Sequence, residues 1–248
     1  MKSYRALVSS DWNECLAPCG PFDFISFAYP DLKLRFQAIF RQYTSNEITL
    51  GEAIGRIHGL LPASITEQQM DTYLKQSFQA YTGVPEMIDW CSDHGILFMI
   101  NTTGMLGYFQ RIFAKGLLTA VPALSAHPMT AYAPGQTDPR YIYELFEIQD
   151  KPRHTESIMR LLNIPPQKVI VMGDSGGDGP HFEWGKSVGA LLVGSMTKTS
   201  LEAYCRSRSI SIDVHFGVSC SAESAKDRDR QLQVDFVDLI PTIEAVLA

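Results

Sequence analysis

The chain has 248 residues, of which 45% are hydrophobic and 19% charged, so it can fill a sizeable core and is not expected to be disordered. Its formal net charge of −6 argues against non-specific nucleic-acid binding, which needs clustered Lys and Arg. No apolar run approaches the length of a membrane span, and the first residues lack a signal-peptide pattern. The five cysteines are odd in number and form no CxxC pair, which is typical of reduced thiols. We therefore expect a cytoplasmic protein that binds neither nucleic acid nor a membrane.

Short apolar segments alternate with longer amphipathic ones over most of the chain, which is typical of βαβ units and a mainly parallel sheet. The segments predicted as buried strands are Arg5–Ser9, Ile96–Asn101, Val121–Ala126, Lys168–Met172, Ala190–Gly194 and Ile212–Phe216. The helices predicted around them are Pro85–His94, Met105–Lys115, Pro152–Leu162, Gly179–Ser187, Ser200–Ser207 and Val237–Val246. The charged stretch Ser221–Arg230 is predicted to be a solvated loop. The predicted fold is α/β, with a Rossmann-like sheet flanked by helices.

Residues 18–83 break this alternation and contain no convincing strand. The helices predicted there are Leu32–Tyr43, Leu50–Leu61 and Glu67–Gln79, the last two with Thr49 and Thr66 as N-caps. We therefore expect a core domain made of residues 1–17 and 84–248, and a small helical cap made of residues 18–83. Such an insert can be a packing appendage or a lid over an active site.

Polar residues follow the predicted strands at the edge where ligands bind in open α/β sheets. Those that come after strands or begin a helix are Asp11, Thr102, Thr103, Gly104, Lys151 and Asp174. Asp174 also lies in a turn with several glycines, which lets the backbone approach a ligand closely. Each residue alone is a common turn or surface residue. Their shared position at strand ends and helix starts is what predicts a site.

These residue types suit a phosphate group and a hard cation. The carboxylates of Asp11 and Asp174 are ligands that Mg²⁺ prefers, and a carboxylate such as Asp11 beside the ion can attack phosphorus to form an aspartyl phosphate. Thr102 and the backbone N–H groups that follow it can donate to phosphate oxygens. Lys151 places a positive charge beside the transferred group. The pattern predicts magnesium-dependent phosphoryl transfer from a small phosphorylated metabolite.

The motifs, in this order, resemble those of the haloacid dehalogenase-like hydrolase superfamily over nearly the whole chain. The segments that look like its four motifs are Val8–Leu16, Ile100–Met105, Lys151 and Gly173–Asp178. The insert is similar to the helical cap of phosphoserine phosphatase-like members. The resemblance implies hydrolysis of a small phosphate ester, with Asp11 as nucleophile and Thr102 and Lys151 on the phosphate. The magnesium ligands it implies are Asp11, Asn13 through its backbone carbonyl, Asp174, and Asp178 as a supporting acid.

One position departs from the family pattern. Phosphatases of the family carry a second Asp two residues after the nucleophile, and this chain has Asn13, which cannot exchange protons. Loss of a positioned acid–base group typically removes about 10²–10⁴-fold in rate. Glu14 is a poor substitute if the segment is extended, because it would point opposite to Asn13. Other candidate proton carriers are His181, Asp23 and Glu47.

Three functions are therefore compatible with the sequence. The favoured one is a magnesium-dependent phosphatase, slow because of Asn13. The second is a weak or inactive relative that binds magnesium and a phosphorylated ligand. The third is a metal-free dehalogenase-type hydrolase, which the acidic turn Gly173–Asp178 disfavours. The aromatic stretch Pro21–Tyr29 is better explained by packing of the insert onto the core than by ligand contact.

Overall fold

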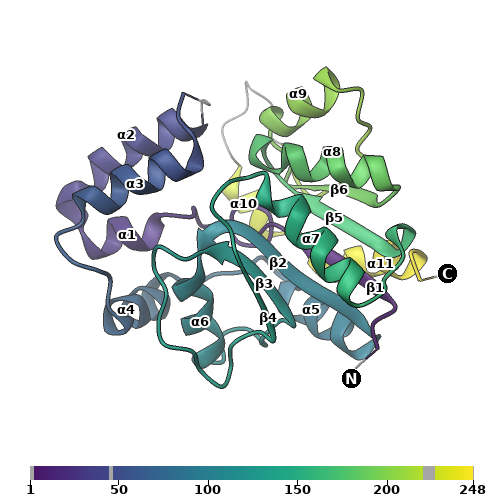
Figure 1. Ribbon diagram of the computed structural model, residues 1–248, viewed down its shortest axis with the longest axis horizontal. Coiled ribbons are helices and arrows are strands. Elements are labelled where there is room, and N and C mark those ends of the chain that lie inside the picture. Colours follow the sequence, from purple (N-terminus) through teal and green to yellow (C-terminus); the bar gives the residue numbers. More distant parts are fainter. Residues whose placement is uncertain (1–2, 45–46, 220–226, 248) are drawn as a thin grey trace.

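The computed structural model describes residues 3–44, 47–219 and 227–247, which form a seven-stranded sheet flanked by helices (Figure 1). The strands are β1 (Ala6–Ser10), β2 (Ile96–Met105), β3 (Ala123–His127), β4 (Tyr141–Glu144), β5 (Val169–Gly173), β6 (Leu191–Ser195) and β7 (Val214–Phe216). All neighbours pair in parallel, in the order β4-β3-β2-β1-β5-β6-β7. The predicted Rossmann-like α/β fold is confirmed.

The helices are α1 (Asp23–Ala28), α2 (Lys33–Thr44), α3 (Leu50–Leu60), α4 (Glu67–Ser77), α5 (Val84–Asp93), α6 (Leu106–Ala114), α7 (Asp150–Leu161), α8 (Gly179–Val188), α9 (Thr199–Ser207), α10 (Arg228–Leu232) and α11 (Ile240–Ala245). None of these described helices is long and apolar enough to cross a membrane. The four described cysteines, Cys15, Cys19, Cys91 and Cys205, are buried free thiols, while Cys220 lies outside the described residues.

The sheet has a hydrophobic core on each face because successive side chains of a strand point to opposite sides. In β1, Leu7 packs with residues of α7, α8 and α9, whereas Val8 packs with residues of α5, α6 and α11. In β5, Val171 and Met172 divide between the two faces in the same way. The near-continuous apolar strands of the sequence therefore reflect burial on both sides.

Three sequence predictions need correction. Strand β4 was not predicted, since its residues Tyr141–Glu144 alternate between half-buried and exposed at the sheet edge and lack an apolar run. The predicted loop Ser221–Arg230 falls partly outside the described residues, and its end belongs to helix α10. The predicted helix Val237–Val246 is divided into a 3₁₀ turn, Phe236–Leu239, and α11, which has Pro241 in its first turn.

Helices α1 to α4 lie together to one side of the sheet (Figure 1, purple to blue). No strand occurs among the described residues of the segment 18–83, as predicted. The predicted N-caps Thr49 and Thr66 are confirmed, because each hydroxyl accepts from the N–H three residues on, at 3.2 Å, within a capping box. The six-residue helix α1 was not predicted, since it is too short to show a periodic pattern.

Aromatic rings join these helices to the core. Phe24 of α1 lies between Tyr73 of α4 and Tyr108 of α6, with ring centroids 6.3 and 6.4 Å away. Phe24 is 3% exposed, whereas Phe27, one helical turn further along α1, is 37% exposed. Of the two tyrosines, Phe27 contacts only Tyr73. The aromatic stretch after residue 20 thus packs α1 against α4 and α6, as the sequence suggested.

We predict that Phe24→Ala destabilises the protein by about 3 kcal/mol or more, because it removes a buried ring and leaves a cavity. Phe27→Ala on the same helix should cost less than half as much, since that ring is already partly solvated. Urea denaturation followed by circular dichroism measures both free energies. Equal losses for the two variants would contradict this assignment of the α1 interface.

Candidate active site

The order in which strands are added to the sheet reverses at β1. Strands β2, β3 and β4 add to one side of β1, and β5, β6 and β7 add to the other. In open α/β sheets such a reversal leaves a crevice outside the carboxyl ends of the two strands involved. Asp11 directly follows β1, and Asp174 directly follows β5. The backbone N–H of Asp11 donates to the Met172 carbonyl at 3.1 Å, so both residues lie at the same edge.

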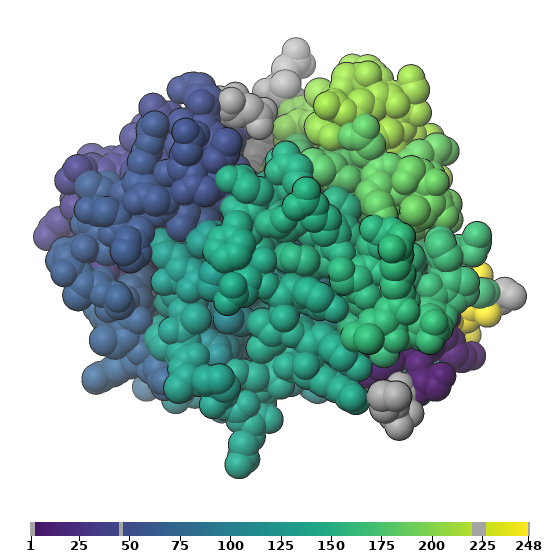
Figure 2. Space-filling view, in the orientation of Figure 1, coloured from purple at the N-terminus to yellow at the C-terminus, as the bar shows by residue number. Residues whose placement is uncertain are grey.

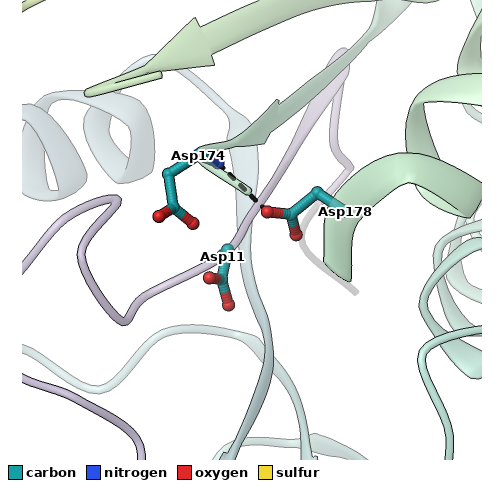
Figure 3. Close-up of side chains that lie close together, drawn as sticks. All are labelled: Asp11, Asp174 and Asp178. Atoms are coloured by element: carbon teal, nitrogen blue, oxygen red, sulfur yellow. Dashed lines mark hydrogen bonds between the residues drawn. The ribbon is translucent and has the colours of Figure 1, made fainter. Parts of the chain in front are cut away.

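Three carboxylates gather at this edge (Figure 3). Asp11, Asp174 and Asp178 are 6%, 1% and 0% exposed, and each offers an oxygen within 4.8 Å of the others. Asp178 folds back beneath its own turn, where its Oδ2 accepts from the N–H groups of Asp174 and Ser175 at 3.0 and 3.1 Å. Gly173 leaves room for this, because a Cβ there would lie 2.5 Å from the Asp178 carboxyl carbon. The glycine-rich turn therefore builds the acidic cluster.

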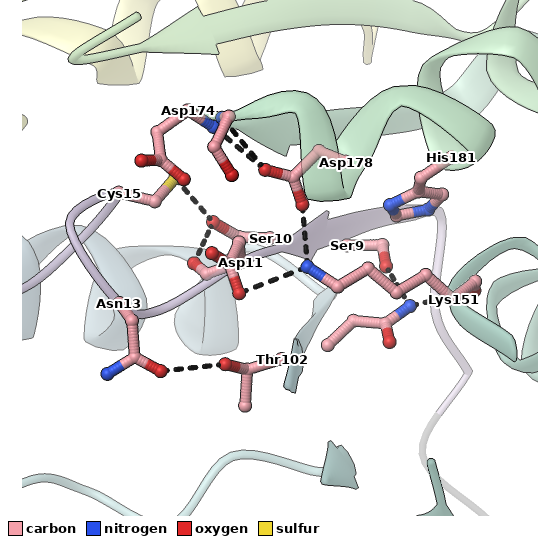
Figure 4. Close-up of polar contacts among 12 residues, drawn as sticks. Ser9, Ser10, Asp11, Asn13, Cys15, Thr102, Lys151, Asp174, Asp178 and His181 are labelled. Atoms are coloured by element: carbon pink, nitrogen blue, oxygen red, sulfur yellow. Dashed lines mark hydrogen bonds and ion pairs between the residues drawn. The ribbon is translucent and has the colours of Figure 1, made fainter. Parts of the chain in front are cut away.

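Lys151 connects two of these carboxylates. Its ammonium group lies 2.6 Å from Asp178 Oδ1 and 3.1 Å from Asp11 Oδ1, and its side chain is 2% exposed (Figure 4). The residue lies inside the first turn of α7, which begins at Asp150, two residues before the predicted helix start at Pro152. Asn101 Nδ2 donates to the Lys151 carbonyl at 2.8 Å and so fixes this turn against β2. The lysine is held rigidly between the two acids.

Burial sets the electrostatics of the cluster. Loss of water raises the pKa of Asp174 to about 7, with Asp178 and Asp11 adding to the shift and Lys198 opposing it. Burial also raises the pKa of Asp11, against the pull of Lys151. For Asp178 burial acts the same way, but Lys151 and the two backbone N–H groups prevail and hold its pKa below the usual range. Positive charge beside Asp11 and Asp174 would favour their ionised forms.

Lys198 is a member of the cluster that the sequence analysis missed. Its ammonium group pairs with Asp174 and lies 2.5 Å from Glu14 Oε2. It comes three residues after β6, so the strand-end argument used for the other positions would have found it. Glu14 has a φ of 61°, hence the segment after Asp11 is not extended, and Glu14 lines the same cleft as Asn13. The extended backbone on which Glu14 was expected to point away from Asn13 is therefore not found.

Asn13 is bonded on both sides of its amide. Thr102 Oγ1 donates to Asn13 Oδ1 at 3.1 Å (Figure 4). Asn13 Nδ2 donates to the Cys19 carbonyl at 3.2 Å. The N–H of Gly104 donates to Thr102 Oγ1, also at 3.1 Å. Thr102, Thr103 and Gly104 all belong to β2. Of these three predicted phosphate-binding residues, Thr103 lines the cleft.

A cleft of about 780 Å³ opens above these residues. Its floor carries Asp11, Asn13, Thr103, Lys151 and Asp174, whereas Thr102 and Asp178 stand behind it. One wall comes from α2 and the opposite wall from α9, which appear in Figure 2 as dark blue and yellow-green atoms on either side of the upper edge. The structure thus brings the predicted residues together from four separate segments of the chain.

The other candidate proton carriers lie outside this cleft. His181 is fully buried, and its Nε2 lies 2.9 Å from Thr155 Oγ1. Burial and the nearby Lys151 lower the pKa of His181 to about 3, so it stays neutral at ordinary pH. Asp23 accepts from the Gly20 N–H at 2.7 Å, and neither Asp23 nor Glu47 is among the described residues that line the cleft.

The donor set fits a magnesium ion. Three buried carboxylates and the half-buried Glu14 face two ammonium groups, those of Lys151 and Lys198, so a further cation would balance the charge. All the ligand atoms on offer are oxygens, which Mg²⁺ prefers over softer ligands.

Comparison with known proteins gives a match to part of the chain by sequence and matches to almost all of it by structure. No family model matches the chain. A 2-hydroxy-3-keto-5-methylthiopentenyl-1-phosphate phosphatase from Brevibacillus brevis is 27% identical over 96 residues, which are 39% of this chain and 41% of that protein. The match thus spans about two fifths of the length of that relative.

Solved structures align over almost the whole chain. A phosphoserine phosphatase captured as a phospho-aspartyl intermediate analogue is 14% identical, with a TM-score of 0.68 over 97% of this chain and 99% of that one. A cytosolic 5′-nucleotidase IIIB bound to cytidine is 14% identical, with a TM-score of 0.63 over 98% and 85% of the two chains. A HAD family hydrolase from Salmonella enterica serovar Typhi is 13% identical, with a TM-score of 0.64 over 86% and 68%. At these identities the likeness shows the fold.

We predict that His181 weakens the fold in acid. Because its pKa is lowered in the folded protein, the unfolded chain binds the proton more readily, and the contribution of His181 to stability falls as pH drops from about 6.5 towards 4 by up to about 1.4 kcal/mol per pH unit. His181→Gln lacks this contribution, so relative to the unchanged protein its unfolding free energy should increase as pH drops over this range. An unchanged slope for His181→Gln would contradict the buried, neutral histidine.

Proposed function

We propose that this chain, which has the fold of the haloacid dehalogenase-like hydrolases, is a magnesium-dependent phosphatase of small phosphate monoesters. One observation carries the proposal. A carboxylate that can act as nucleophile, Asp11, lies beside a buried ammonium group, Lys151, and a second buried carboxylate, Asp174, on the floor of one cleft. The relatives named above are phosphatases or hydrolases, and one was captured as a phospho-aspartyl analogue.

In the proposed reaction, an Asp11 carboxylate oxygen attacks phosphorus and the bond to the ester oxygen breaks, giving an aspartyl phosphate and an alcohol. Water then hydrolyses the acyl phosphate and restores Asp11. Lys151 orients Asp11 at 3.1 Å and offers positive charge to the equatorial oxygens of the transferred group. Asp178, behind the cleft, keeps the lysine in place at 2.6 Å.

Magnesium would be held by Asp11 and Asp174, with the backbone carbonyl of Asn13 and the carboxylate of Asp178 in support. When bound, it supplies charge that stabilises the phosphoryl oxygens in the transition state. For the phosphate itself, Thr103 is better placed than Thr102. The Thr102 hydroxyl is already bonded to Asn13, whereas Thr103 lines the cleft.

We also propose that residues 18–83 act as a cap that closes the cleft and selects the substrate. Three residues of α2, Phe40, Tyr43 and Thr44, line one wall of the cleft. At about 780 Å³ the cleft suits a small metabolite, which agrees with the small phosphorylated compounds named for the relatives.

A second candidate function is binding of magnesium and a phosphorylated ligand without turnover. The amide of Asn13 favours it, because both its ends are held in hydrogen bonds and neither can supply a proton. The third candidate, a metal-free dehalogenase, is disfavoured by three buried carboxylates that lie close enough to share an ion.

We predict that Asp11→Asn lowers magnesium-dependent hydrolysis of 4-nitrophenyl phosphate by at least about 10³-fold, because it removes the nucleophile. Asp23→Asn, a change outside this cleft, serves as the matched control and should keep most of the activity. EDTA should abolish turnover by the unchanged protein. Binding of phosphate with magnesium but no turnover would support the second function, whereas EDTA-resistant activity would argue against the metal.

We predict that Asn13→Asp raises turnover of an alkyl phosphate by about 10-fold or more, since it adds an acid–base group where phosphatases of this fold carry one. In the protonated form, the new carboxyl can donate to the Cys19 carbonyl as the amide now does at 3.2 Å. The gain should be smaller on 4-nitrophenyl phosphate, whose leaving group needs no proton. An unchanged rate on alkyl esters would mean that another group already assists the leaving oxygen.

A further inference from the structure

Tyr43 reaches the active site from outside the sheet. It lies in the last turn of α2, yet it lines the cleft together with Asp11 and Lys151. Its hydroxyl oxygen approaches the acidic turn, because a Cβ built on Gly177 would lie 3.7 Å from it. Tyr43 therefore extends from the α2 wall across to the turn that carries the metal-binding acids.

The Tyr43 ring is held in place but its hydroxyl is not engaged. The ring packs against Phe40 at 6.2 Å between centroids, and Phe40 in turn meets Phe22 edge to face at 5.6 Å. The hydroxyl forms no hydrogen bond with any other residue that the structure describes. Because the ring is fixed and the residue lines the cleft, its hydroxyl is available to a ligand bound there.

The surroundings keep this hydroxyl protonated. Burial raises the pKa of Tyr43 to about 12, with Lys151 opposing the shift and Asp178 and Asp11 adding to it. Tyr43 shares the cleft with the proposed nucleophile, Asp11. At neutral pH the Tyr43 hydroxyl is therefore protonated and can donate a hydrogen bond.

Geometry indicates which atom would accept that bond. In phosphoryl transfer the attacking and leaving oxygens are roughly in line, so a nucleophile on the floor directs the leaving oxygen toward the opposite side. Asp11 lies on the floor beyond β1, and Tyr43 belongs to the wall from α2. Lys151 and the β2 end already serve the equatorial oxygens in the proposed reaction, whereas Asn13 offers no proton to the leaving oxygen.

We propose that the Tyr43 hydroxyl donates a hydrogen bond to the ester oxygen that leaves with the alcohol, an inference that rests on the proposed function. As the bond from phosphorus to this oxygen breaks, its electron pair stays on the oxygen, and the hydrogen bond from Tyr43 stabilises the negative charge as it develops. Because an alkyl alcohol is a weaker acid than the tyrosine, the oxygen leaves with the Tyr43 proton, and solvent water then returns a proton to Tyr43 and is left as hydroxide. Tyr43 thereby fills part of the role that an acid would have at position 13.

Orthovanadate with magnesium tests this without turnover, because its apical oxygen occupies the position of the leaving group. Tyr43→Phe keeps the ring and should weaken vanadate binding about 10-fold, as expected for loss of one hydrogen bond to a charged group. Tyr29→Phe removes another tyrosine hydroxyl of the segment 18–83, one bonded to the Ala63 carbonyl at 2.7 Å, and should change the affinity less than about 2-fold. Isothermal titration calorimetry measures all three dissociation constants.

Steady-state kinetics with two esters then show whether the oxygen that accepts the hydrogen bond is the leaving oxygen. Tyr43→Phe should lower kcat/KM about 10-fold for an alkyl phosphate and less than about 3-fold for 4-nitrophenyl phosphate, whose leaving group is already stable. Equal losses on both esters would overturn the assignment to the leaving oxygen. Unaltered vanadate affinity in Tyr43→Phe would overturn the inference and leave the proposed function standing. If the unchanged protein binds no vanadate in the presence of magnesium, both the inference about Tyr43 and the proposed function are contradicted.

Discussion

The site depends on how three buried carboxylates are compensated at the carboxyl edge of one sheet. Charged groups removed from water are costly unless they are paired or hydrogen-bonded. Lys151 serves Asp11 and Asp178 together, and Lys198 serves Asp174. Two ammonium groups do not fully balance these acids and Glu14. Burial is the main cause of the raised pKa of Asp174, and the nearby carboxylates of Asp178 and Asp11 add to it. The uncompensated negative charge is what makes a divalent cation a suitable partner of the site.

Contacts behind the cleft hold these charged side chains in place. Asp178 does not line the cleft, yet it fixes Lys151 from behind and is itself held by the backbone of its own turn. The turn can close this tightly because Gly173 has no side chain to collide with Asp178. On the other side, Asn101 holds the first turn of α7 through the Lys151 carbonyl. The lysine is thus located by contacts that no ligand needs to provide.

The parts of the fold and site that follow from local pattern could be predicted. Strands β1, β2 and β5 are apolar on both faces, and Asp11 and Asp174 follow two of them, so their meeting at one edge was expected. Features set by tertiary contacts were not predictable. The edge strand β4 lacks an apolar run, and Glu14 turns toward the cleft because its backbone is left-handed. Nothing in the sequence near Tyr43 reveals that α2 brings it over a turn 130 residues away in the chain.

Because residue 13 is Asn, the proposed reaction depends on helices α1 to α4 as well as on the loops at the end of the sheet. An Asp at that position would leave the proposed nucleophile and a proton donor on the same loop, so the proposed reaction would need little from α2. With Asn13 tied to Thr102 and Cys19, the proposed reaction takes its assistance to the leaving oxygen from elsewhere, and Tyr43 lines the same cleft. The proposed reaction then depends on how α1 to α4 are seated on the core. Phe24 contributes to that seating, because its buried ring joins α1 to both α4 and α6.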